Sequence, residues 1–199
     1  MAESTLALSW TDLQAEVGYF LGYGRTSGDW TAAQLVEIQA VVAAGVRQFY
    51  YPPPIGEQAA PHTWSFLQAT GSGTATTYNY ALPDDFGGMI GDPQYASASS
   101  KRRIVETTVE DLLAMRAMAT ASGDPSYYAI RHLTAPSSTA GQRFEMLLYP
   151  TPTSAAITYR YKVLPPALSS AYVYPYGGAE HAETVLASCL AVDEHRMDD

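Results

Sequence analysis

One long amphipathic segment constrains this fold more than any other feature of the sequence. Its apolar residues recur three or four positions apart over about five helical turns, namely Leu35, Ile38, Val42, Val46 and Phe49. Thr31 precedes them, and Gln34 follows Thr31 at the spacing of a capping box. Residues 52–54 are prolines, which cannot continue a helix. The sequence therefore predicts a helix from about residue 31 to 51 with one buried face.

Shorter helices are predicted in three other places. The first begins at Ser9 or Thr11, which are good capping residues, and stops at Gly22. The second spans about residues 107–122, and the third spans about residues 178–199. The third helix has an apolar stripe that comprises Ala182, Val185, Leu186, Cys189 and Leu190.

The remaining segments have the alternation or the composition of β-strands. Residues 157–163 alternate cleanly and place on one face Ile157, Tyr159, Tyr161 and Val163. This pattern is typical of a half-buried antiparallel strand. Residues 144–149 are the other clear strand, and the prolines within residues 149–153 mark the turn expected to join the pair. Weaker strands are predicted near residues 64–67, 74–80, 89–95, 102–106 and 127–133.

These elements predict an α+β fold, in which a small helical bundle carries an inserted antiparallel β-sandwich-like domain. The whole chain, residues 1–199, is expected to form one unit because no long linker divides it. The helical bundle is expected to comprise about residues 1–55, 107–122 and 178–199. The β insert is expected to comprise about residues 60–106 and 126–165.

Composition narrows the possible functions. Charged residues make up 16% of the chain, against about 25% in an average protein, and 15 residues are tyrosine. Tyrosine is enriched at protein interfaces, so part of the surface is expected to contact other chains. With 11 Lys and Arg against 20 Asp and Glu, the net charge is −9. That charge argues against binding duplex DNA by neutralising its phosphates.

The sequence also indicates where the protein is made. Its first residues lack the basic and apolar regions of a secretory signal. No apolar run approaches the roughly 20 residues of a membrane span. A single cysteine, Cys189, excludes an intramolecular disulfide and a cysteine-based zinc site. We therefore expect synthesis in a reducing cytoplasm.

Motifs for catalysis or cofactor binding are not found. The four histidines, His62, His132, His181 and His195, follow no zinc-binding pattern, so we expect them to be unliganded. Cys189 lies in an apolar stripe, which favours a buried residue over a nucleophile. No nucleophilic serine motif or glycine-rich phosphate loop occurs. The protein is expected not to be an enzyme, with no catalytic residue, no cofactor and no metal.

Two charged clusters each allow a second interpretation. Asp84-Asp85 would suit a glycosidase carboxylate pair, although the surrounding Leu-Pro-Asp-Asp-Phe sequence favours a turn. Lys101-Arg102-Arg103 would suit a phosphate backbone. In an acidic chain, however, three cations favour a solvated strand end or a salt bridge to a partner.

Several short motifs, none of which has a catalytic or ligand-binding pattern, occur in a characteristic order. They are residues 48–52 (Gln-Phe-Tyr-Tyr-Pro), 64–67 (Trp-Ser-Phe-Leu), 82–86 (Leu-Pro-Asp-Asp-Phe), 123–130 (Gly-Asp-Pro-Ser-Tyr-Tyr-Ala-Ile), 147–152 (Leu-Leu-Tyr-Pro-Thr-Pro) and, after a Tyr-x-Tyr strand, Leu164-Pro165. From about Leu35 to Arg196, the chain resembles the head-to-tail adaptor (connector) proteins of tailed bacteriophages. This family includes the tail tubular A-type ring proteins.

The resemblance implies a structural virion protein of the neck between capsid and tail, made in the host cytoplasm. Such proteins form a homo-oligomeric ring, usually of twelve copies, that docks beneath the dodecameric portal after DNA packaging. The ring would form part of the DNA exit channel and allow transient, non-specific passage of duplex DNA. It would also contact the next neck or tail protein, such as a stopper, tail tube or nozzle, and no membrane.

The resemblance further implies which parts make the contacts. The helices would form the ring body, the β part would project outward or tailward, and the C-terminal segment would reach the portal. We expect the portal or ring interface to comprise Val192, Asp193, Glu194, His195, Arg196, Met197, Asp198 and Asp199. Deleting them should abolish portal binding without unfolding the monomer. Residues 52–61 and the 82–86 turn are further candidates for contacts between neighbours.

The acidity of the chain suits an adaptor, because carboxylates that face a channel would repel DNA and keep it from adhering. Two other functions remain open at this point. One is a cell-wall hydrolase carried by the tail, which a zymogram would detect. The other is a tail-tip β module that binds a glycan or a receptor, which a glycan array would detect.

Overall fold

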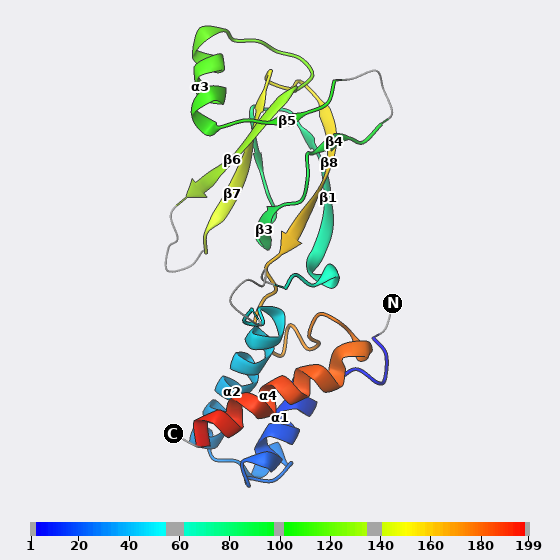
Figure 1. Cartoon of the computed structure of the whole chain (residues 1–199), viewed down its shortest axis with the longest axis vertical. Helices are drawn as coiled ribbons and strands as arrows, with labels where there is room; N and C mark the ends of the chain where they lie inside the picture. The colour runs from blue at the N-terminus through cyan, green and yellow to red at the C-terminus, as the bar shows by residue number, and fades with distance from the viewer. Residues whose placement is uncertain (1–2, 55–61, 98–101, 135–140, 198–199) are drawn as a thin grey trace. The chain divides into compact units, whose positions relative to one another are not determined.

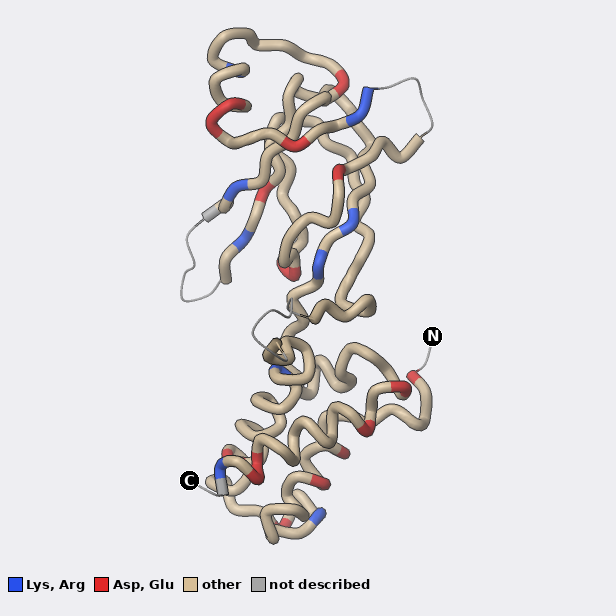
Figure 2. The backbone as a smooth tube through the Cα atoms, in the orientation of Figure 1, with Lys and Arg blue, Asp and Glu red and all other residues tan. Residues whose placement is uncertain are grey.

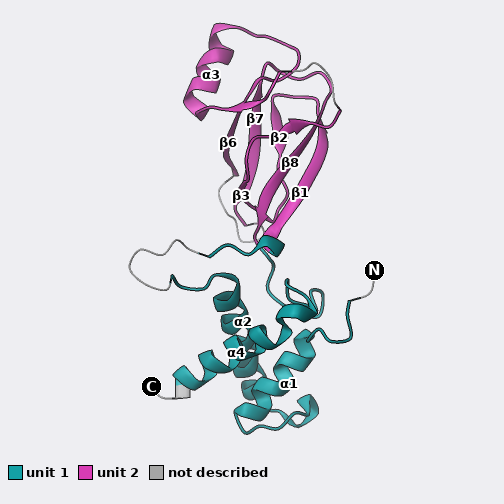
Figure 3. Ribbon diagram, turned by 45° about the vertical axis from the view of Figure 1, so that its right-hand side comes forward, with its two compact units in different colours: residues 1–66, 165–199 teal, residues 67–164 magenta. Residues whose placement is uncertain are grey.

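The computed structural model describes residues 3–54, 62–97, 102–134 and 141–197. The chain divides into two compact units (Figure 3). Unit 1 comprises residues 1–66 and 165–199, and unit 2 comprises residues 67–164. Unit 1 is helical and unit 2 is built mainly from strands, which confirms the predicted α+β class. In the sequence, unit 2 is inserted between the two segments of unit 1.

Three helices of unit 1 pack against one another (Figure 1): α1 (Trp10–Phe20), α2 (Ala32–Tyr50) and α4 (Ala182–Met197). Capping boxes begin the first two helices. Ser9 caps α1 together with Asp12, and Thr31 caps α2 together with Gln34, as the spacing of the latter pair predicts. Each box satisfies backbone N–H groups that a helix leaves unpaired at its first turn.

The core of unit 1 comes from the predicted apolar stripes. Among its fully buried side chains are Leu13, Val17, Ile38, Val42, Val185 and Cys189. Helices α2 and α4 approach closely at Gly45, where an added Cβ would lie 2.7 Å from both the backbone N and the Sγ of Cys189. A glycine is therefore required at this crossing.

Aromatic rings pack at the C-terminal end of α2. Trp64 donates a hydrogen bond from Nε1 to the carbonyl oxygen of Phe49 at 2.7 Å, and its ring stacks on Phe66. Residues Ser65–Leu67 form a 3-10 turn, not the strand predicted at residues 64–67. The rings of Trp64 and Phe66 both contact Phe49, and the bond from Trp64 Nε1 holds this segment against the end of α2 rather than in a sheet.

Unit 2 contains two four-stranded sheets (Figure 1). The first sheet contains β1 (Gln68–Ala75), β8 (Ala155–Val163), β3 (Phe86–Met89) and β4 (Gln94–Tyr95). The second contains β2 (Asn79–Ala81), β7 (Arg143–Tyr149), β6 (Tyr127–Thr134) and β5 (Val105–Glu106). All described pairs are antiparallel except β5 with β6. Residues of both sheets share one apolar core.

Strand β8 buries the face that its alternation predicts. Ile157, Tyr159, Tyr161 and Val163 are all buried. The expected hairpin between residues 144–149 and 157–163 is wrong, however. Strand β7 pairs with β2 and β6, whereas β8 pairs with β1, β3 and β4 in the other sheet. Each sheet needs a second layer to cover its apolar face, and the chain crosses between the layers at this point.

The helix α3 (Val109–Met118) also departs from the prediction, which placed residues 107–122 in the helical bundle. It packs on β6 and β7 within unit 2. Leu112, which is completely buried, contacts a small cluster with Ala129 and Leu147. Met146 and Leu148 lie on the opposite face of β7, in the core between the sheets. Because α3 covers the outer face, residues 146–149 of β7 form a continuous apolar run.

Candidate functional site

The predicted contact segment, residues 192–199, lies at the end of α4. This helix continues to Met197, and residues 198–199 lie outside the described part of the chain. Glu194, His195 and Arg196 are exposed, and Val192 is half-buried. Asp193 differs from them, since it is only 1% exposed. The structure therefore separates three side chains that a partner can reach from one that belongs to the bundle.

The Asp193 carboxylate is in an unfavourable environment. Its Oδ2 is buried and has no hydrogen-bond partner among the described residues. Burial raises the pKa of Asp193, the nearby negative charge of Glu37 raises it further, and Arg196 partly offsets this. Glu37 itself accepts a hydrogen bond from Tyr23 Oη at 2.8 Å. Buried polar groups are normally paired, so this end of α4 is a local weak point of the bundle.

The burial of Asp193 could have been predicted from its helical spacing. Ala182, Val185 and Cys189 are buried, and Asp193 follows Cys189 by four positions. Residues four positions apart lie on the same face of a helix. Asp193 therefore continues the apolar stripe, although its charge suggests a surface residue.

The net negative charge of the protein is confined to unit 1. Unit 1 has twelve Asp and Glu against three Arg, a net charge of −9, and unit 2 has eight acidic and eight basic residues, a net charge of zero. Figure 2 shows the contrast along the backbone. The composition alone could not reveal this segregation, because it depends on which segments fold together.

The few cations of unit 1 do little to offset its acidity. Arg25 bonds both carboxylate oxygens of Glu16, at 3.0 and 2.9 Å, and its guanidinium lies 3.9 Å from the ring centroid of Tyr19. Arg196 lies close enough to Asp193 to lower its pKa. Arg47 is exposed and lines an apolar pocket. Among the described residues of unit 1, Glu16 is the one carboxylate that forms an ion pair with an arginine.

An apolar pocket of about 290 Å³ lies within unit 1. It is formed by the second half of α2 and the segment that follows unit 2, with a lining of Ala43, Val46, Arg47, Tyr50, Tyr51, Pro165, Pro166, Ala167 and Leu168. Burial raises the pKa of Tyr50 to about 12, and its hydroxyl accepts a hydrogen bond from the backbone N–H of Tyr176 at 2.8 Å. Tyr172, Tyr174 and Tyr176 are exposed in the same segment. Part of the tyrosine surplus is thus on the surface of unit 1.

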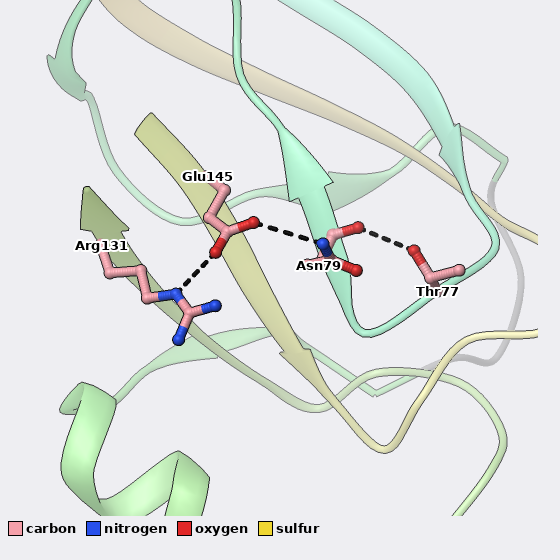
Figure 4. Close-up of polar contacts among 4 residues, drawn as sticks. All are labelled: Thr77, Asn79, Arg131 and Glu145. Carbon is pink, nitrogen blue, oxygen red and sulfur yellow. Dashed lines mark hydrogen bonds and ion pairs between the residues drawn. The ribbon is translucent and has the colours of Figure 1, made fainter. Parts of the chain in front are cut away.

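A buried ion pair that the sequence did not reveal lies in unit 2 (Figure 4). Glu145 is 2% exposed, and its Oε1 accepts a hydrogen bond from Arg131 Nε at 2.6 Å. Its Oε2 accepts a bond from Asn79 Nδ2 at 3.3 Å. Thr77 donates in turn to the backbone oxygen of Asn79. Because both carboxylate oxygens of Glu145 have a hydrogen-bond partner, the network supports a structural role for this residue.

Three of the four histidines lie beside aromatic rings or a side-chain amide. His62 contacts the Trp64 ring, His132 Nδ1 lies 2.6 Å from Gln142 Nε2, and His181 packs among aromatic rings. His195 is exposed. Across the described ranges, no group of three or more His, Cys, Asp or Glu could hold a metal ion. Cys189 is buried, as the apolar stripe predicts.

The two acidic turn residues have separate partners. Asp84 forms a two-pronged ion pair with Arg143, at 3.0 and 3.1 Å. Asp85 accepts a hydrogen bond from Tyr161 Oη at 3.2 Å. Since Leu82 and Phe86 are buried in the core, only residues 83–85 of this turn can contact a neighbour.

Two other predicted contact regions are described in part. Arg103 pairs with Asp92 within the chain, at 2.5 Å, and Lys101 lies outside the described residues. Residues 55–61 of the candidate 52–61 loop also lie outside them. Within the part of the chain that the structure describes, no helix is long and apolar enough to cross a bilayer.

Comparison with known proteins assigns the chain to a family. A model of the SU10 adaptor protein family matches residues 8–191, which include all of unit 2 and most of unit 1. A search of curated proteins gave no significant match. Because the family model covers most of the chain, the protein belongs to the SU10 adaptor protein family, a family of phage head-to-tail adaptors.

Proposed function

We propose that this protein forms a homo-oligomeric ring beneath the phage portal, and that the ring is part of the DNA exit channel. Its partners would be the portal on one side and the next neck or tail protein on the other. A subunit of a closed ring uses two different surfaces, one for each neighbour. The low charge content of the chain and the exposed tyrosines of unit 1 support such extensive contacts.

The confinement of the net charge of −9 to unit 1 is the observation that carries the channel assignment. Duplex DNA has about one negative charge per 1.7 Å of its axis. An acidic wall repels it over roughly one Debye length, about 8 Å at physiological salt. Unit 1 would therefore face the lumen, where DNA must pass without adhering. Unit 2 has a net charge of zero, so its surface would not repel DNA in this way.

The exposed end of α4 is proposed as the portal contact. Glu194, His195 and Arg196 project from the last turns of the helix and are free of the bundle core. Deleting residues 192–199 would also remove the buried Asp193, so a loss of docking after that deletion would have two explanations. Point substitutions at exposed positions separate contact from folding.

Electron microscopy of the protein mixed with purified portal tests the proposal. The wild-type chain should add a ring of density beneath the portal, and Glu194→Lys combined with Arg196→Glu should remove it. Glu183→Lys, an exposed position in the first turn of the same helix, is the matched control and should leave docking unchanged. Docking of the double variant at the wild-type level would exclude the end of α4 as the contact. Absence of a wild-type ring would contradict the adaptor role.

A further inference from the structure

Strand β1 is an open edge of its sheet. It stands at the end of the strand order β1-β8-β3 and pairs with β8 along all eight residues without a bulge (Figure 3). Among the described residues, no backbone hydrogen bond outside that ladder involves Gln68–Ala75. In an antiparallel ladder, every second residue directs its N–H and C=O away from the partner strand. Within the described part of the chain, the outer edge of β1 therefore presents a row of backbone donors and acceptors without partners.

This edge lacks the usual protection against strand pairing. Natural edge strands are interrupted by charged residues, prolines or bulges, or they are very short. The sequence of β1, Gln-Ala-Thr-Gly-Ser-Gly-Thr-Ala, contains no charge and no proline. The other edge strands of the two sheets have only two to four residues. A long, uncharged and regular edge is thus found at β1 alone among the described strands.

The opposite edge of the same sheet shows how this protein does protect an edge. The register of β3 against β8 shifts between Phe86 and Met89. Gly88 has φ +139° and Gly91 has φ +71°, so the backbone turns away from a regular strand. Arg103 then bonds to Asp92 beside this edge. The contrast shows that β1 lacks the features that protect the opposite edge.

Gly71 and Gly73 of β1 are glycines because tyrosine side chains on the inner face of the sheet leave no room for a Cβ atom. A Cβ added at Gly71 would lie 2.5 Å from Cζ of Tyr159, and one added at Gly73 would overlap the Tyr80 hydroxyl. The outer face has no such restriction. Thr70, Ser72 and Thr74 are exposed there, and a lysine at any of them would have protected the edge.

The chemistry beside β1 indicates what kind of strand fits. Arg160 on β8 is exposed, and it donates from Nη2 to Gln68 Oε1 at 2.7 Å, so its guanidinium lies over β1. Lys162, paired in register with Gln68, is also exposed. A strand added beside Gln68 would meet these cations, and a carboxylate on its outer face would pair with Arg160.

A second copy of β1 does not meet this requirement, because β1 has no acidic residue. The remaining edge strands of unit 2 are too short to supply an eight-residue partner. These two observations favour an occupant from a different protein over pairing between unit 2 strands of two copies. We propose that β1 is a strand-addition site, at which an extended segment of a partner protein extends the sheet and places an acidic side chain against Arg160. Main-chain hydrogen bonds give such a contact its affinity, and alternate side chains give it specificity.

A labelled peptide tests this proposal on the full-length chain. The probe is a fluorescent nonapeptide of alternating valine and threonine with glutamate at both ends, so that either strand direction places a carboxylate near Arg160. Fluorescence anisotropy should show binding to the wild-type chain. Hydrogen exchange should then slow at alternate amides of residues 68–75. Ser72→Lys and Thr74→Lys should each weaken binding by about tenfold or more.

Matched controls separate the edge from general charge effects. Ala156→Lys adds the same charge to the exposed face of β8, one strand away from the edge, and should leave peptide binding unchanged. Arg160→Glu should weaken binding of the glutamate peptide and strengthen binding of the same peptide ended by lysine. Equal binding of the wild-type chain and Ser72→Lys, or no binding at all, would overturn the proposal.

Two other measurements distinguish this site from the proposed function and from self-pairing. Ser72→Lys should still dock on the portal, since the portal contact is assigned to α4. Sedimentation of the chain alone would show a dimer that Ser72→Lys dissociates if a second copy occupies β1, and that result would also overturn the proposal.

Discussion

Arg131 on β6 and Glu145 on β7 are direct cross-strand partners, and their side chains form an ion pair of 2.6 Å at a position where Glu145 is 2% exposed. Asn79 on β2 completes the network from the other side (Figure 4). The carboxylate thus joins three strands of one sheet. A charge in such a place is tolerated only while its partners remain.

Removing Arg131 should therefore destabilise unit 2 more than neutralising Glu145. Arg131→Ala leaves a buried carboxylate without its cation, and we expect a loss of about 2 kcal/mol in the free energy of unfolding, because the arginine itself is partly exposed. Glu145→Gln should cost about 1 kcal/mol, since an amide can keep part of the hydrogen bonding. Urea unfolding followed by far-UV circular dichroism measures both.

Arg143→Ala is the control for this pair. Arg143 and Asp84 form an ion pair on the surface, with side chains 47% and 74% exposed, so its loss should cost less than about 1 kcal/mol. An equal cost for Arg131→Ala and Arg143→Ala would mean that the burial of Glu145 has no energetic consequence.

Gly45→Ala should destabilise unit 1 by more than about 2 kcal/mol, although alanine is the better helix former by about 1 kcal/mol. The added methyl group would overlap the backbone of Cys189, which cannot move without displacing α4. Trp10, Trp30 and Trp64 all lie in unit 1, so tryptophan fluorescence during urea unfolding reports this unit alone. A variant as stable as the wild-type chain would show that α2 and α4 do not cross closely at Gly45.

Cys189 should resist alkylation while unit 1 is folded. Its side chain is completely buried, and burial raises the pKa of the thiol to about 12. The thiolate is the reactive form, so its population at pH 8 is very small. Iodoacetamide labelling followed by mass spectrometry should be slow in buffer and fast in urea, with the change at the unfolding transition of unit 1. Rapid labelling of the folded chain would contradict the packing of α4.

Asp193→Asn should stabilise unit 1 at neutral pH. The pKa of Asp193 is raised in the folded state, so the ionised form opposes folding. The penalty is absent below the unfolded pKa of about 3.9 and develops as the pH rises through the folded pKa. We expect a gain of about 1 kcal/mol at pH 7 that disappears near pH 4.

Thermal unfolding at the two pH values measures this gain. Glu194→Gln, at the exposed neighbouring position, removes the same charge from the same helix and should leave the stability almost unchanged. If both variants gained equally, the effect would come from the overall acidity of unit 1 and not from the burial of Asp193.

Local patterns predicted the elements of this fold well, because they are properties of contiguous residues. The capping pair Thr31 and Gln34 and the prolines at 52–54 define α2 within a residue or two. The alternation of residues 157–163 predicts both β8 and its buried face. Cys189 is buried because it lies in a helical stripe that the sequence already displays.

Strand pairing and helix packing were harder to predict from the sequence, because they depend on residues far apart in the chain. Strands β7 and β8 are consecutive and yet belong to different sheets. Helix α3 has only one fully buried residue, Leu112, and nothing local shows that this residue packs on β6 and β7. Asp193 has the charge of a surface residue and the position of a core residue.

The sequence by itself determined the helices, the clearest strand and the ordered motifs of the adaptor family, since capping, periodicity and proline breaks act within a few residues. Tertiary structure alone decided which segments share a unit. That choice places all of the net charge in unit 1, buries Glu145 and Asp193, and leaves β1 at an open edge. Burial, charge segregation and edge exposure are properties of the packed molecule, because each depends on which distant residues become neighbours.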